Sequence, residues 1–179
     1  MIQELYQKAI KYAGDKHSKQ LVPGTNSNYL LHISNVAMEV LVAYSHSESF
    51  DIAYAIQVAI LHDTIEDTSS TYEEIKELFG ENIAKGVQAL TKNENLSTKE
   101  EMMLDSLRRI NEQIDEVGLV KLADRITNLQ HPPPHWTQEK VKKYLNEAKL
   151  IAKELQNKNE YLSDRIEKKI EEYRKYVKD

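Results

Sequence analysis

Apolar residues recur every three or four positions along most of the chain, the spacing that places them on one face of an α-helix. The first such stripe runs from Ile2 to Ala13 and the second from Leu30 to Tyr44. Residues 55–61 are apolar nearly all round, which predicts a central, buried helix. The alternating pattern of a strand and the turn signals of a hairpin are absent. The periodicity therefore predicts an all-α fold.

Residues that cap or end helices mark the middle of the chain. Thr71 with Glu74, and Ser97 with Glu100, have the spacing of a capping box, in which side chains at a helix start bind each other's backbone N–H groups. Gly80 predicts the end of the helix that begins near Thr71. A new amphipathic helix is expected after Ser97.

The C-terminal part of the chain continues the helical pattern. A helix is predicted over 117–130 and is ended by the three prolines at 132–134. Two long amphipathic helices follow, over 141–155 and 162–177. With no repeat and no low-complexity linker, we predict a single domain, residues 1–179, that forms a bundle of roughly eight helices.

Composition narrows the classes of partner. The 24 Lys and Arg residues against 29 Asp and Glu residues give a net charge of −5, which argues against binding to nucleic acid. No window approaches the ~20 apolar residues of a membrane span, and the acid-bearing N-terminus resembles no signal peptide. The chain has no cysteine, so histidines and carboxylates are the only strong metal ligands. We expect a cytoplasmic protein, and the sequence leaves a homo-oligomer open.

Four side chains of the ligand type follow the apolar faces of three predicted helices. They are His32, His62, Asp63 and Asp124. A lone histidine on an apolar face is usually a hydrogen-bonded core residue, and a lone aspartate after a helix is usually a cap. Such groups are costly away from water unless they are paired or coordinate a cation. All four together favour a metal site, and its mixed nitrogen and oxygen ligands suit Mn²⁺, Fe, Zn²⁺ or Mg²⁺.

The order of these residues, H…HD…D, resembles that of the HD-domain metal-dependent phosphohydrolases. The stretches AILHDTIEDTSSTYEEIKELFG and KLADRITNL are similar to the hydrolase domain of RelA/SpoT-type proteins and to the small alarmone hydrolases. The similarity extends from AIKYAGDKHSKQ to HWTQEKVKKYLNEA. These enzymes remove the 3′-pyrophosphate of guanosine tetra- or pentaphosphate, (p)ppGpp, generally with Mn²⁺. The resemblance implies a helical HD-type bundle, and the length of 179 residues implies a hydrolase-only form.

The resemblance also implies roles for individual residues. His32, His62, Asp63 and Asp124 correspond to the metal ligands. Glu66 and Asp67 correspond to the catalytic acid pair, with Glu66 orienting or deprotonating the attacking water; on their own they would pass for a solvated turn. The residues expected to bind the substrate are Asn128, Lys140 and Tyr144.

One segment departs from the family pattern. Leu21, Val22 and Pro23 stand where related chains carry a basic stretch that helps to hold the purine base and the phosphates. The nucleotide therefore stays open, and a ppApp-like substrate is an alternative to (p)ppGpp. Two further alternatives are an HD enzyme acting on 5′-nucleotides and a nucleotide-binding module without activity. The Glu66-Asp67 pair of HDTIEDT argues against the first, and the presence of all six ligand and acid residues argues against the second.

Overall fold

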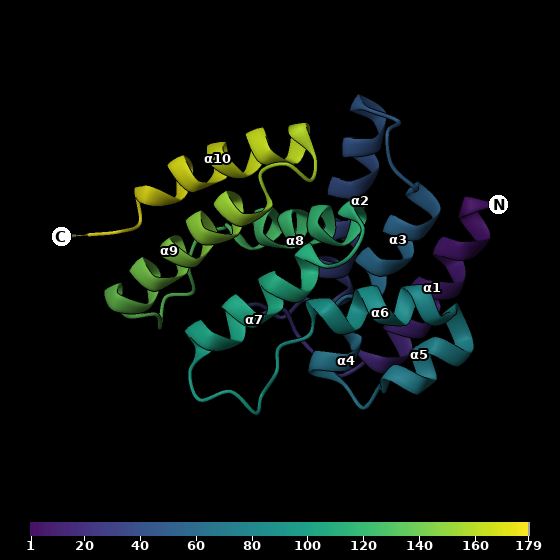
Figure 1. Ribbon diagram of the computed structural model, residues 1–179. Coiled ribbons are helices and arrows are strands. Elements are labelled where there is room, and N and C mark those ends of the chain that lie inside the picture. Colours follow the sequence, from purple (N-terminus) through teal and green to yellow (C-terminus); the bar gives the residue numbers. More distant parts are fainter. Residues whose placement is uncertain (179) are drawn as a thin grey trace.

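The computed structural model describes residues 1–178 and is helical throughout (Figure 1). Within that range it contains ten helices, and the single β-type contact is an isolated bridge between Leu21 and Asn28. The helices are α1 (Ile2–Lys16), α2 (Leu30–His46), α3 (Ile52–Leu61), α4 (Thr64–Asp67), α5 (Tyr72–Phe79), α6 (Glu81–Leu90), α7 (Lys99–Asn111), α8 (Asp115–Asn128), α9 (Gln138–Leu155) and α10 (Glu160–Arg174).

The all-α prediction is confirmed, with two helices more than the pattern of apolar residues indicated. One is α4, a single turn directly after the HD dipeptide. The other is α6, which begins where Gly80 ends α5 with a φ of 96°. None of the helices in residues 1–178 is long and apolar enough to cross a membrane. The single domain over 1–179 stays a prediction, and its last residue lies outside the described range.

Helix α8 forms the centre of the bundle (Figure 1). Every residue from Val117 to Ile126 except Lys121 is buried. The helix contacts α2, α3, α6, α7, α9 and α10. The predicted buried segment 55–61 is confirmed in α3, where all seven residues are buried. The two most deeply buried helices therefore supply most of the site described below.

The start of α7 corrects one detail of the sequence interpretation. The capping box is formed by Thr98 and Glu101, one residue later than the predicted pair of Ser97 and Glu100. The Thr98 hydroxyl accepts the Glu101 N–H at 3.1 Å, and the Glu101 carboxylate accepts the Thr98 N–H at 3.0 Å. The sequence STKEE allows both registers, because it places a hydroxyl residue three positions before a glutamate twice in succession. Extended backbone at Thr98 selects the later register.

The core of α8 offers a direct test of packing. Leu122 is fully buried, so Leu122→Ala should lower the free energy of unfolding by about 2–5 kcal/mol, through lost burial and the cavity left behind. Leu104→Ala is the matched control, since the Leu104 side chain on α7 is 48% exposed. Urea denaturation of both variants measures the difference. Equal, small losses would contradict the central place of α8.

Candidate metal centre

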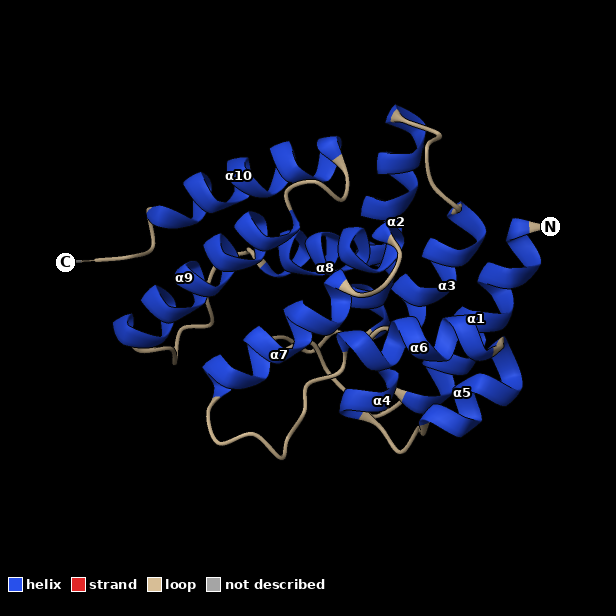
Figure 2. Ribbon diagram, in the orientation of Figure 1, coloured by secondary structure: helices blue, strands red, loops and turns tan. Residues whose placement is uncertain are grey.

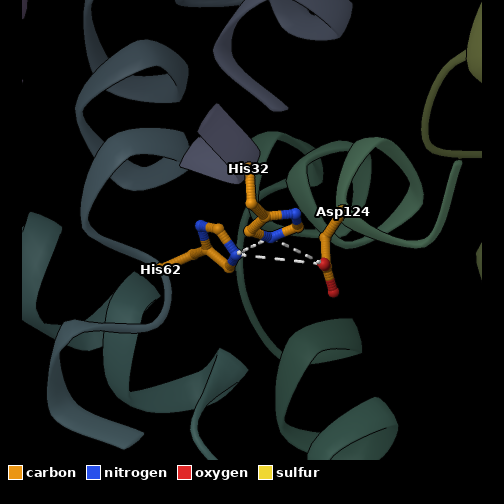
Figure 3. Close-up of side chains that lie close together, drawn as sticks. All are labelled: His32, His62 and Asp124. Atoms are coloured by element: carbon orange, nitrogen blue, oxygen red, sulfur yellow. Dashed lines mark hydrogen bonds and ion pairs between the residues drawn. The ribbon is translucent and has the colours of Figure 1, made fainter. Parts of the chain in front are cut away.

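Three helices direct one side chain each to a common point (Figure 3). His32 lies in the first turn of α2, His62 caps the C-terminus of α3, and Asp124 lies on α8. The two histidine Nε2 atoms are 3.3 Å apart. Asp124 Oδ1 is 3.4 Å from His32 Nε2 and 3.9 Å from His62 Nε2. All three side chains are buried, and their ligand atoms lie within 4.8 Å of one another.

Asp63 completes the group from the junction between α3 and α4. Its Oδ2 lies 2.9 Å from His62 Nε2 and 3.7 Å from His32 Nε2. The Tyr29 hydroxyl donates a hydrogen bond to the same oxygen at 2.5 Å. The structure thus brings together the four residues predicted as metal ligands. Tyr29, which the sequence analysis did not single out, fixes one of them.

The donor atoms fit a divalent cation. His62 Nδ1 lies 2.7 Å from the carbonyl oxygen of Ala59, so the ring carries its hydrogen there and turns the lone pair of Nε2 towards His32. The two imidazole nitrogens are then 3.3 Å apart, and each lies 2.9–3.9 Å from an oxygen of Asp63 and of Asp124. Such a cluster of lone pairs is unfavourable in a buried site without a positive charge between them.

The electrostatics of the cluster lead to the same conclusion. Burial alone would lower the pKa of His62, but the neighbouring carboxylates of Asp63 and Asp124 raise it to about 9. Burial alone would likewise raise the pKa of Asp124, but Lys121 and the histidines hold it well below its ordinary value. The centre therefore attracts positive charge, as a nitrogen and oxygen metal site does.

Two neighbours orient Asp124. Lys121 Nζ contacts Oδ2 at 2.9 Å, and the side-chain amide of Asn128 donates to Oδ1 at 2.6 Å. Hydrogen-bonded ligands of this kind are held in a fixed rotamer. Asn128 was predicted to bind the substrate. It is exposed at the C-terminus of α8. Lys121 was missed, although its place three residues before Asp124 on one helix was a usable signal.

The two predicted catalytic acids, Glu66 and Asp67, both lie on α4 but bind different partners. Glu66 binds Lys92, with Oε2 accepting the backbone N–H at 2.9 Å and Oε1 at 2.5 Å from Nζ. Asp67 Oδ2 instead accepts a hydrogen bond from Gln20 at 2.9 Å. In the described part of the chain, neither carboxylate forms a hydrogen bond or ion pair with the four clustered residues. The two acids therefore have separate hydrogen-bond partners in the structure.

A cavity lies next to Glu66. Its volume is about 520 Å³, and its lining includes Glu66, Lys92 and Asn93. Lys92 belongs to the loop that joins α6 to α7 and extends away from the helices (Figure 2). This loop brings a cation to the acid pair from a distant part of the chain.

The other predicted substrate residues belong to an aromatic group beside α8. The Arg125 guanidinium lies 4.3 Å from the ring centre of Tyr144, and Lys140 Nζ lies 4.3 Å from that of Trp136. The two rings are 5.1 Å apart. Lys140 and Tyr144 thus belong to one group, and its member Arg125 follows Asp124 directly on α8.

Residues 21–28, which include the positions where a basic stretch was expected, form a tightly folded loop. Leu21 pairs with Asn28, and the Val22 N–H donates to the carbonyl of Ser27 at 2.9 Å. Gly24, with a φ of +79°, packs against Pro133, where a Cβ would come within 3.3 Å of the proline ring. Residues 21–28 contain no lysine or arginine, so this loop offers no positive side chain to a phosphate.

The fold and the histidine–aspartate cluster together define a class of helical metal-site proteins, and comparison with known proteins identifies it. Residues 9–161 match the model of the HD domain. The match covers most of the chain, which therefore belongs to the HD-domain family.

Individual relatives are enzymes of nucleotide metabolism by name. The guanosine-3′,5′-bis(diphosphate) 3′-pyrophosphohydrolase MESH1 of Danio rerio is 29% identical over 163 residues, which cover 88% of each chain. A guanosine-3′,5′-bis(diphosphate) 3′-pyrophosphohydrolase of Aquifex aeolicus is 37% identical over 129 residues, which cover 71% of this chain and 18% of that longer protein.

A solved structure shares the whole architecture. It is described as a metazoan ortholog of SpoT that hydrolyzes ppGpp and plays a role in starvation responses. It superimposes with a TM-score of 0.80 at 25% identity, and the match covers 94% of both chains.

Proposed function

We propose that this protein is a metal-dependent hydrolase of the 3′-pyrophosphate of (p)ppGpp. The reaction breaks the bond between the 3′-oxygen and its phosphorus, and it releases pyrophosphate with GDP or GTP. The observation that carries the proposal is the cluster of the buried residues His32, His62 and Asp124 with the half-buried Asp63, in a chain that aligns with a named 3′-pyrophosphohydrolase over 88% of both lengths.

The cluster would hold the metal through His32 Nε2, His62 Nε2, Asp63 and Asp124. We propose Mn²⁺ as the ion, from the resemblance to the alarmone hydrolases. When bound at such a site, a divalent cation lowers the pKa of a coordinated water and supplies hydroxide near neutral pH. Asn128 and Lys121 keep Asp124 oriented, and Tyr29 does the same for Asp63.

The acid pair would handle the protons. We assign Glu66 to orienting or deprotonating the attacking water, and Asp67 to supporting that water or the departing 3′-oxygen. Lys92 contacts both oxygens of Glu66. One of these contacts therefore has to be released before Glu66 can bind the water. Asp67 is exposed, and partial burial of its carboxyl group together with the charge of Asp63 raises its pKa.

The substrate would be a small nucleotide held on the surface formed by Asn128, Lys140 and Tyr144. Rings and guanidinium groups such as those of Trp136 and Arg125 suit the stacking of a base or the binding of a phosphate. A ppApp-like nucleotide is the second candidate. It is favoured by one observation, the loop 21–28 without positive charges.

One assay separates these substrates. The purified protein with Mn²⁺ is offered ppGpp, pppGpp, ppApp and simple 5′-nucleotides, and the products are resolved by ion-exchange chromatography. We expect pyrophosphate together with GDP from ppGpp. Turnover of 5′-nucleotides alone would make the protein a different HD enzyme. Binding of ppGpp without turnover, in protein shown to contain metal, would make it a binding module.

The loop 21–28 leads to a prediction about affinity. Each charge-assisted contact to a phosphate is worth about 1.5–3 kcal/mol, so the loss of one or two should raise KM by about one to three powers of ten. We expect a high KM for ppGpp, and we expect the double variant Val22→Arg/Pro23→Lys to lower it.

Steady-state kinetics on ppGpp and ppApp measure this effect. The matched control is Ser47→Arg/Ser49→Lys, which adds two cations to the exposed α2–α3 loop. A micromolar KM of the parent for ppGpp would show that other residues replace the missing cations. An equal fall of KM in the control would show a general charge effect.

A further inference from the structure

We propose that Gln20, itself held by His17, is a positioning residue that fixes the carboxylate of Asp67 for the reaction. The inference rests on the proposed function, because it assigns a support to one of the two acids. Three side chains form a continuous hydrogen-bonded relay. His17 Nδ1 lies 2.6 Å from Gln20 Oε1, and Gln20 Nε2 donates to Asp67 Oδ2 at 2.9 Å.

The chemistry of the three groups allows only one direction of donation. An ionised carboxylate can only accept hydrogen bonds, so the amide NH₂ of Gln20 must face Asp67. The amide oxygen then faces His17, which must carry its ring hydrogen on Nδ1. Burial of the His17 ring lowers its pKa, which agrees with a neutral imidazole that has one hydrogen.

The residues at the start of this relay, His17 and Gln20, are held in fixed positions. His17 is 1% exposed, and its ring centre lies 5.0 Å from that of Tyr29. The Gln20 backbone is held at both ends, since its N–H donates to the His17 carbonyl at 2.9 Å and its carbonyl accepts the Tyr29 N–H at 2.9 Å. Tyr29 also donates to Asp63. One tyrosine therefore links the relay to the metal centre.

Asp67 needs such a support because little else holds it. It is the last residue of a four-residue helix, and the side chain is exposed. A free aspartate side chain samples several rotamers, whereas a hydrogen bond from a fixed donor selects one. The bond from Gln20 occupies Oδ2, so Oδ1 is the oxygen that we assign to the water or the 3′-oxygen.

The first test is Gln20→Met, which keeps the length of the side chain and removes the amide. We expect kcat on ppGpp to fall about tenfold, as for the loss of one hydrogen bond to a charged group. KM should stay within about twofold, because ground-state binding does not use this bond. Metal content should equal that of the parent, since Gln20 contacts none of the four proposed ligands. Gln7→Met, at an exposed position of α1, is the matched control.

A double-mutant cycle with Asp67→Ala shows whether Gln20 acts through Asp67. Residues that act through one contact give non-additive effects, so Gln20→Met should cause no further loss of kcat in the Asp67→Ala background. Gln20→Glu supplies a second measurement. It keeps the contact to His17 but cannot donate to Asp67, and it should lose at least as much kcat as Gln20→Met.

The outcomes are distinct. An equal loss in both backgrounds, or normal kcat in Gln20→Glu, overturns the inference and leaves the proposed function intact. A parent that cleaves none of the nucleotides overturns the proposed function. In that case nitrogen-15 NMR of His17 still tests the relay: we expect the Nδ1–H tautomer in the parent and its loss in Gln20→Met. An unchanged tautomer would overturn the relay itself.

Discussion

Asp63→Ala is expected to abolish both metal binding and turnover. Asp63 supplies a carboxylate oxygen 2.9 Å from His62 Nε2 and 3.7 Å from His32 Nε2. The variant removes one of the two carboxylates and leaves two histidines and one aspartate at the site. Loss of an outer neighbour of a ligand already weakens metal binding by about 10–100-fold, so loss of a ligand should weaken it further.

Elemental analysis and ppGpp hydrolysis measure the two effects on the same preparation. Asp15→Ala, at an exposed position of α1, is the matched control and should keep both metal and activity. Thermal unfolding in the presence of a chelator shows whether Asp63→Ala still folds. Full metal occupancy in a folded Asp63→Ala variant would exclude Asp63 as a ligand.

Tyr29→Phe refines the same test. It removes the hydroxyl that donates to Asp63 Oδ2 and keeps the ring that packs on His17. If Tyr29 only orients the ligand, metal affinity should fall by about 10–100-fold, as for other outer neighbours. The two variants thus separate a ligand from its support.

The metal cluster could be predicted because helical periodicity decides which residues face the interior. His32 and Asp124 continue apolar stripes of α2 and α8, and both are buried in the structure. The sequence pattern could not supply their distances, since these depend on how three helices cross. It also could not assign the residues that support the cluster. Tyr29 and Asp63 are separated by 34 residues, and their contact exists only after folding.

The contacts of the acid pair Glu66 and Asp67 also could not be predicted from the sequence. The motif predicted that Glu66 and Asp67 form a catalytic pair, but it could not show which residues each of them contacts. In the structure α3 ends at Leu61 and a separate turn, α4, begins at Thr64. This break gives the two acids different partners, and neither partner is near them in sequence: Lys92 lies 26 residues away from Glu66 and Gln20 lies 47 residues away from Asp67.

The starts of α6 and α7 could not be predicted, because the local sequence fits more than one boundary. The STKEE sequence admits two capping registers, and α6 follows α5 with only Gly80 between them. A glycine that ends one helix does not show whether another begins directly after it. In the structure Thr98 caps α7, and α6 begins at Glu81 with Ile83 and Val87 buried.

Glu66→Gln should separate chemistry from metal binding. The change keeps the shape of the side chain and removes its charge and its basic oxygen, so kcat should fall by about 10²-fold or more, the range for loss of a general base. Glu66 is not one of the clustered ligand residues, so metal content should equal that of the parent. The amide oxygen of glutamine can still accept the Lys92 backbone N–H, which keeps the α6–α7 loop in place.

The measurement combines single-turnover and steady-state kinetics on ppGpp with elemental analysis of each preparation. Glu77→Gln is the matched control, because Glu77 is exposed on α5 and the change removes the same charge. Lys92→Met completes the set by removing the ion pair and leaving Glu66 intact. If Glu66 is the base, Lys92→Met keeps more activity than Glu66→Gln, since the carboxylate remains. Normal turnover by Glu66→Gln would instead show that Glu66 serves only to anchor Lys92 and its loop.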